Sequence, residues 1–232
     1  MRMYRITPLR LPGPGEGSPP IWPVLLQWEG EDRALLVDCG CAGTLPQLEE
    51  ALAGAGASLG DLQALALTHC DHDHMGLARE LTGRCPGLGV YCSAVQRPFV
   101  AGEAASPRSV AAGRPAPVDD PVPGAVALEG DAPFPGWEGL WVVDTPGHMP
   151  GHIALYCKEE RTLIAGDALT AEEGRLAGPN PRYTLDMEEG METVRLLARL
   201  DLQTVLCHHG GAVRGDIPRQ LEALFRAWRE DR

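Results

Sequence analysis

The sequence predicts a layered fold of mixed helices and strands, and the order of its apolar segments carries that prediction. Residues 34–68 show a buried strand, a helical period and a second strand, which together make one β-α-β unit. Residues 76–92 show the same helix and strand order again. The chain has 232 residues, of which 44% are hydrophobic, so it can bury a large core. We therefore expect a single domain over residues 1–232.

The elements follow from apolar runs, helical spacing and Gly or Pro breaks. Two irregular stretches interrupt them, a Gly- and Pro-rich loop at 11–20 and an Ala-, Gly- and Pro-rich segment at 101–124. We call residues 101–124 the flap, because a loop of that length in a compact domain is usually functional. The segment 171–183 is also expected to be irregular. Strands are expected at 3–9, 22–28, 34–38, 62–67, 88–92, 125–128, 140–144, 153–156, 162–165 and 204–207, and helices at 45–55, 76–82, 185–200 and 218–229.

Composition excludes several classes of function. The formal net charge is −12, which argues against a nucleic-acid partner, because phosphate binding needs clustered Lys and Arg. No apolar run approaches the length of a membrane span, so no membrane partner and a cytoplasmic location are expected. The seven cysteines are an odd number without secretory context, which favours reduced thiols. Cys39 and Cys41 form a C-x-C pair that we interpret as packing, since no second pair follows.

The histidines are confined to three short stretches, and each follows a predicted strand. All seven lie at 69–74, 148–152 or 208–209, in Thr-His-Cys-Asp-His-Asp-His, Thr-Pro-Gly-His-Met-Pro-Gly-His and His-His-Gly-Gly contexts. Asp38 and Asp167 also follow predicted strands. Side chains at the ends of neighbouring strands meet at one rim of a layered fold, so we expect these motifs to converge there. Imidazoles and carboxylates in such a cluster indicate a metal site.

The order of these motifs resembles the metallo-β-lactamase superfamily, from about residue 34 to residue 211. The resemblance implies an α+β fold, a four-layer αββα sandwich in which two mixed β-sheets are flanked by helices. It also implies a dinuclear site for two divalent metal ions, usually zinc and less often iron or manganese.

The resemblance also assigns roles to individual residues. Asp167 matches the carboxylate that bridges both ions, and Asp38 matches a residue that orients the ligands through hydrogen bonds. His209 is preferred to His208 because it directly precedes a glycine, and His152 is expected to lie behind the ligands. The implied metal ligands are His69, Asp71, Asp73, His74, His148, Asp167 and His209.

This chain departs from the family pattern at Asp71, where relatives have a second histidine. A shifted register, with His72 and His74 as the His-x-His pair, would place Gly76 and Leu77 at ligand positions, and neither can bind a metal. The unshifted register therefore places His72 in a spacer. A carboxylate at Asp71 favours harder ions such as iron or manganese, and loss of the first ion is the other outcome.

The implied reaction is hydrolysis of a small-molecule ester, thioester, lactone or related bond by a metal-bridging hydroxide. Asp73 is expected to orient the attacking water, and Tyr183 is a candidate substrate contact. Two alternatives stay open, an iron-dependent oxidoreductase of the flavodiiron or persulfide dioxygenase kind, and a non-catalytic ligand-binding relative. A homo-oligomer is also left open.

Overall fold

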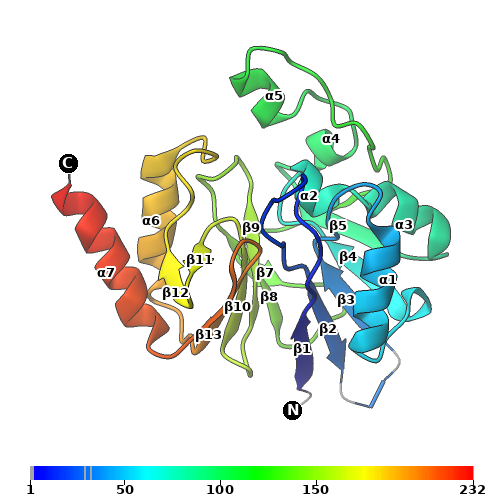
Figure 1. Ribbon diagram of the computed structural model, residues 1–232, viewed down its shortest axis with the longest axis horizontal. Coiled ribbons are helices and arrows are strands. Elements are labelled where there is room, and N and C mark those ends of the chain that lie inside the picture. Colours follow the sequence, from blue (N-terminus) through cyan, green and yellow to red (C-terminus); the bar gives the residue numbers. More distant parts are fainter. Residues whose placement is uncertain (1–2, 29, 32, 232) are drawn as a thin grey trace. The chain divides into compact units, whose positions relative to one another are not determined.

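The computed structural model describes residues 3–28, 30–31 and 33–231, and its chain forms two compact units (Figure 1). The first unit is Met1–Glu129 and the second is Gly130–Arg232. Each unit contains one six-stranded sheet of mixed direction. The expected single domain over 1–232 stays a prediction. None of the helices in the described ranges is long and apolar enough to cross a membrane.

The sheet of the first unit changes from antiparallel to parallel along its width. Its strand order follows the sequence, and β1, β2 and β3 pair antiparallel, whereas β3 to β6 pair parallel. Strands β2 and β3 are buried along their whole length, and nearly all of their residues are apolar. The strands are β1 (Tyr4–Pro8), β2 (Val24–Trp28), β3 (Ala34–Val37), β4 (Leu62–Ala66), β5 (Gly89–Ser93) and β6 (Val126–Leu128).

The helices of the first unit make the crossovers between its parallel strands. Helix α1 (Leu45–Gly54) buries Leu45, Leu48 and Leu52, the stripe that its helical period predicts. A 3-10 turn η1 (Leu59–Asp61) leads into β4, and α3 (Ala78–Arg84) and α4 (Arg97–Val100) contact β5.

Two short helices of the first unit correct the sequence expectations. The histidine motif includes the helix α2 (His72–Met75), and the flap contains α5 (Pro107–Ala111), which Ser106 caps through a hydrogen bond from the Ser109 N–H. Neither helix has enough residues to show a period in the sequence.

The sheet of the second unit has the order β14-β13-β10-β9-β8-β7. Only β10 and β13 pair parallel, and the other neighbours are antiparallel. The expected strands are present as β8 (Leu140–Asp144), β9 (Ile153–Cys157), β10 (Thr162–Gly166) and β13 (Thr204–Cys207). Two strands of this sheet were not expected, β7 (Ala132–Pro133) and β14 (Gly211–Arg214).

The core of the second unit lies under its two long helices. Helix α6 (Met187–Leu197) is capped by Asp186, whose side chain accepts a hydrogen bond from the Glu189 N–H. Helix α7 (Ile217–Glu230) packs against α6, as Figure 1 shows. The expectation that 171–183 is irregular is wrong in part, because β11 (Thr170–Glu172) and β12 (Arg175–Ala177) form a hairpin there.

Candidate metal centre

In the first unit, two parallel strands bring Asp38 and Thr68 together. The register of β3 and β4 pairs Val37 with Ala66, so the residues that follow each strand emerge at the same edge. Asp38 is 2% exposed and accepts hydrogen bonds from the Thr68 N–H (2.9 Å) and from the Thr68 hydroxyl (2.9 Å to Oδ2). Its φ of 57° is left-handed, a conformation in which Asp and Asn are enriched among non-glycine residues.

Asp38 also fixes the tautomers of two histidines. An ionised carboxylate only accepts hydrogen bonds, so His74 donates from Nδ1 to Asp38 Oδ2 (2.8 Å). The Thr68 hydroxyl donates its one proton to Asp38, so His69 donates from Nδ1 to Thr68 Oγ1 (3.0 Å). Nε2 is therefore the acceptor nitrogen of both rings, which is the form that binds a metal. Both imidazoles are fully buried.

The remaining residues of the first motif divide by burial. Asp73 is buried near the start of α2, whereas the side chain of His72 is 73% exposed. The side chain of Asp71 is 15% exposed, a fraction between those of Asp73 and His72. Its Oδ2 lies 3.4 Å from His69 Nε2. The same carboxylate accepts hydrogen bonds from Arg108 in the flap, so the flap reaches the metal motif.

In the second unit, a tight turn after β8 presents His148. The preceding residue, Gly147, has a φ of +121°, and a Cβ there would lie 2.2 Å from the backbone of Gly190 in α6. Only glycine allows this approach, so the turn is fixed against the helix. His148 Nε2 then lies 3.5 Å from Asp167 Oδ2.

The second histidine of that turn, His152, uses both of its ring nitrogens. The Asp167 N–H donates to His152 Nε2 (3.1 Å), so His152 Nδ1 carries the proton and donates to Thr145 Oγ1 (2.7 Å). His152 is buried and has no ring nitrogen left for a metal. Its expected role behind the ligands stays a prediction, and these two contacts are compatible with it.

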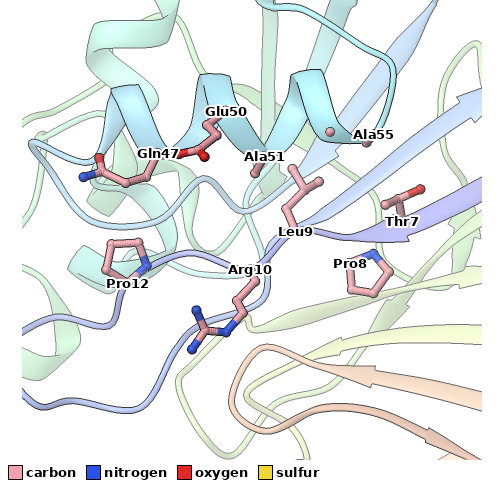
Figure 2. Close-up of a pocket in the computed structure, with 10 residues that line it drawn as sticks. Thr7, Pro8, Leu9, Arg10, Pro12, Gln47, Glu50, Ala51 and Ala55 are labelled. Atoms are coloured by element: carbon pink, nitrogen blue, oxygen red, sulfur yellow. The ribbon is translucent and has the colours of Figure 1, made fainter.

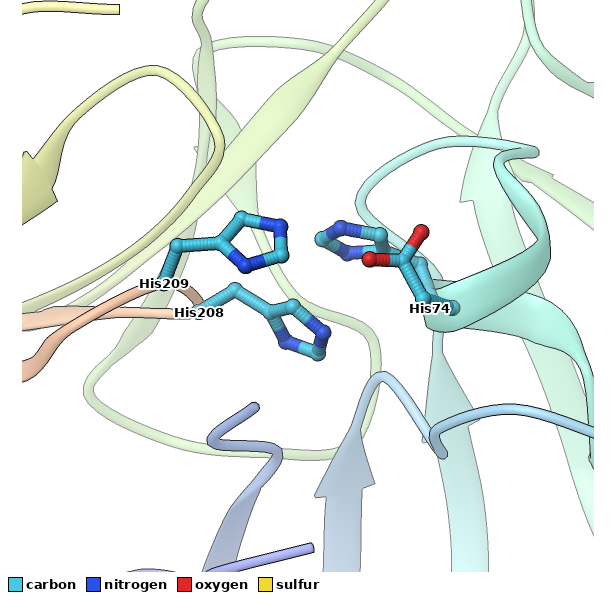
Figure 3. Close-up of side chains that lie close together, drawn as sticks. His74, His208 and His209 are labelled. Atoms are coloured by element: carbon cyan, nitrogen blue, oxygen red, sulfur yellow. The ribbon is translucent and has the colours of Figure 1, made fainter. Parts of the chain in front are cut away.

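The last motif follows β13, whose parallel neighbour β10 ends just before Asp167. His209 Nε2 lies 3.4 Å from Asp167 Oδ2, the oxygen that His148 Nε2 also approaches. The rings of His208 and His209 lie edge to face, 5.1 Å apart, and Figure 3 shows both rings on the turn after β13. His208 is buried, whereas the side chain of His209 is 36% exposed.

The donor set in each unit fits a divalent cation. Two donor atoms that each lie about 2.1 Å from a tetrahedral ion lie about 3.4 Å apart. Three nitrogen–oxygen pairs have this separation, His69 with Asp71 (3.4 Å), His148 with Asp167 (3.5 Å) and His209 with Asp167 (3.4 Å). Imidazole nitrogens with carboxylate oxygens are suited to zinc, iron or manganese. Each unit thus holds a His and Asp cluster that is consistent with metal binding.

All seven cysteines are buried, and in the described part of the chain they form no disulfide and no second metal set. Burial raises the pKa of the Cys41 thiol to about 11 and that of Cys92 to about 12. Cys39 is also buried, and its thiol donates to the His74 carbonyl (3.2 Å). The C-x-C pair thus has a packing role, as expected from the sequence.

The cavity drawn in Figure 2 lies elsewhere in the first unit. It has a volume of about 620 Å³ and is formed by the end of β1, the following loop and α1. None of the predicted site residues lines it. Tyr183, the candidate substrate contact, is 48% exposed, and Arg182 lies over its ring at 5.4 Å.

Three residues that act on the clusters were not expected from the sequence, Thr68, Thr145 and Arg108. Thr68 and Thr145 each begin a histidine motif, one residue before His69 and three residues before His148, and that position was an available signal. Arg108 lies 37 residues from Asp71 in a segment without periodicity, and nothing in the sequence links the two.

Comparisons with known proteins agree on one family. Residues 20–209 match the profile described as the Metallo-beta-lactamase superfamily. Probable metallo-hydrolase YflN of Bacillus subtilis (strain 168) is 31% identical over 178 residues, which cover 66% of this chain and 66% of that protein. The match thus spans slightly less than two thirds of that relative. A hydroxyacylglutathione hydrolase of Gloeobacter violaceus is 34% identical over 111 residues, 47% of this chain and 36% of that protein.

Solved structures match almost the whole chain. A metallo-β-lactamase family protein from Thermus thermophilus superposes with a TM-score of 0.72 at 25% identity, covering 97% of this chain and 79% of that one. The subclass B3 metallo-β-lactamase MEM-A1, from a soil metagenome library, has a TM-score of 0.70 at 18% identity and covers 97% and 91% of the two chains. The predicted fold is confirmed, with two mixed six-stranded sheets and flanking helices.

Proposed function

Because the chain belongs to the metallo-β-lactamase superfamily, we propose that it is a metal-dependent hydrolase of a small-molecule ester, thioester or lactone. The observation that carries this proposal is the approach of two imidazole Nε2 atoms to one carboxylate oxygen, Asp167 Oδ2, at 3.4 and 3.5 Å. Relatives whose names include metallo-hydrolase and hydroxyacylglutathione hydrolase support this class of reaction.

The residues that would hold divalent ions are the two clusters described above. We assign His69, Asp73 and His74 of the first unit, and His148, Asp167 and His209 of the second. Asp71 belongs to the same motif, but Arg108 already occupies its carboxylate. Divalent ions, when bound, lower the pKa of a bound water and polarise a carbonyl group.

The chain's own residues position the reacting groups. Asp73 is buried, so its carboxylate can accept a hydrogen bond from the attacking water and orient it. Asp38 holds His69 and His74 in one tautomer, and His152 holds the backbone N–H of Asp167. These fixed orientations mean that little rearrangement is needed when a metal binds.

A paired substitution within one motif tests this proposal. Purified protein is analysed for zinc, manganese and iron, and assayed on panels of esters, thioesters and lactones. Asp73→Ala is expected to abolish hydrolysis, whereas His72→Ala, at a side chain that is 73% exposed, keeps it. If Asp73→Ala hydrolyses as fast as the parent, the assigned role is wrong. Bound iron with oxidase activity and no hydrolysis would replace the hydrolase with the iron-dependent alternative.

A further inference from the structure

We propose that Arg108 and a divalent cation compete for the Asp71 carboxylate, so that cation binding at His69 and Asp71 releases the flap. This inference rests on the proposed function, because it requires that the first motif binds a cation. Asp71, the residue that departs from the family pattern, would then have two alternative partners, Arg108 and the cation. The flap would then respond to the metal content of the protein.

The pair between Arg108 and Asp71 has the geometry of a strong interaction. Arg108 Nε lies 2.9 Å from Asp71 Oδ1 and 2.8 Å from Oδ2, and Nη2 also donates to Oδ2. The side chain of Asp71 is 15% exposed and that of Arg108 is 33% exposed. A guanidinium fork on a mostly buried carboxylate is stronger and more specific in geometry than an exposed ion pair.

The competition concerns one oxygen atom. Asp71 Oδ2 accepts two hydrogen bonds from Arg108 and lies 3.4 Å from His69 Nε2, the separation expected of two ligands of one ion. A cation bound to both atoms would bring a double positive charge next to the guanidinium. The two positive groups repel each other, so the carboxylate cannot serve both at full strength.

Arg108 also ties the middle of the flap to the metal motif of the first unit. Hydrogen bonds within this part of the flap join Ser106 N to Ala116 O (2.9 Å) and Ser109 Oγ to Ala116 O (2.8 Å). Most of the residues at 105–120 are exposed. Loss of the Arg108 contact would remove a tie between α5 and the metal motif, so amide exchange in this exposed segment should become faster.

Competition makes two measurable effects reciprocal. If Arg108 weakens cation binding, then the cation weakens the Arg108 contact by the same factor. Couplings between sites are typically about 5- to 150-fold in affinity. We expect Arg108→Gln to bind Mn²⁺ about tenfold more tightly at the first motif, and Arg108→Lys, which keeps the charge but not the fork, to lie between it and the parent.

The experiment is a titration of the metal-stripped full chain with Mn²⁺ and, separately, with Zn²⁺, followed by amide hydrogen exchange of residues 105–116 with and without Mn²⁺. Arg97→Gln is the matched control, because Arg97 makes a similar two-contact pair with another flap carboxylate, that of Glu103 (2.7 and 2.9 Å), and not with Asp71. Circular dichroism of each variant shows that it is folded.

Tighter Mn²⁺ binding in Arg108→Gln but not in Arg97→Gln, with faster exchange of 105–116 when Mn²⁺ is added to the parent, supports the competition. Equal Mn²⁺ affinity in the parent and in Arg108→Gln overturns it and leaves the proposed function standing. Absence of Mn²⁺ and Zn²⁺ binding in all variants, the parent included, overturns both.

Discussion

Replacing Asp38 with Asn tests whether one carboxylate orients both histidines of the first motif. Asn has nearly the same shape and tolerates the left-handed φ of 57° at this position, so the change removes charge without adding backbone strain. The carboxylate accepts from the Thr68 N–H, the Thr68 hydroxyl and His74 Nδ1. Asn keeps one acceptor oxygen, but its NH₂ group takes the place of the other oxygen. That NH₂ group would face Thr68 or His74, which are themselves hydrogen-bond donors.

The expected size of the effect follows from these contacts. Two hydrogen bonds to a charged group are lost, each of about 1.5–3 kcal/mol, and the cheaper burial of a neutral amide offsets part of that loss. We therefore expect a net decrease of about 2 kcal/mol in the free energy of unfolding. Loss of the partner that fixes the ligand tautomer should weaken metal binding about 10- to 100-fold.

Urea unfolding and metal titration against a chromophoric chelator measure the two effects. Asp61→Asn is the control, because Asp61 also accepts hydrogen bonds, from Ser58 N (2.7 Å) and Ser58 Oγ (2.9 Å), but on the exposed turn η1. It should leave metal affinity unchanged. An Asp38→Asn protein that binds metal as tightly as the parent would refute the orienting role.

Three further outcomes are expected. Gly147→Ala should lower the free energy of unfolding by more than about 2 kcal/mol. Gly139 also has a positive φ but open space around it, so Gly139→Ala should lower this free energy by only about 1 kcal/mol. Equal losses of stability in urea unfolding would contradict the packing argument. His152→Ala should weaken metal binding, because it removes the contact to the Asp167 N–H but not a metal ligand. Metal content measures the effect. If His152→Ala loses its bound metal as completely as Asp167→Ala does, His152 is itself a ligand. Cys41, with a pKa of about 11, should be roughly 1% thiolate at pH 9. A thiol reagent should therefore react slowly with this residue in the folded protein and rapidly in denaturant. Fast labelling of Cys41 in the folded protein would contradict the burial of its thiol.

The strand ends could be predicted from the sequence because each is marked by a simple pattern. An apolar run followed by Asp or His placed Asp38, His69 and Asp167 at the ends of β3, β4 and β10. Parallel pairing then made neighbours of Asp38 and Thr68. The convergence of all the motifs at one rim stays a prediction that rests on the family.

The contacts that tune the site were beyond sequence reasoning, because they depend on side-chain geometry. His148 and His152 both follow a glycine in the same turn, but His152 contacts Thr145 Oγ1 and the Asp167 N–H, whereas His148 Nε2 lies 3.5 Å from Asp167 Oδ2. The hairpin of β11 and β12 has three residues in each strand, too few for alternation to be visible. The contact between Arg108 and Asp71 joins an irregular segment to a motif, without any local signal.

The most direct test of the metal centre is an anomalous difference map from crystals of the protein grown with excess Zn²⁺. We predict a peak about 2.1 Å from His148 Nε2 and from Asp167 Oδ2, on the side that His209 Nε2 also faces. A well-ordered Asp167 and His148 with no peak beside them at saturating Zn²⁺ would contradict the assignment.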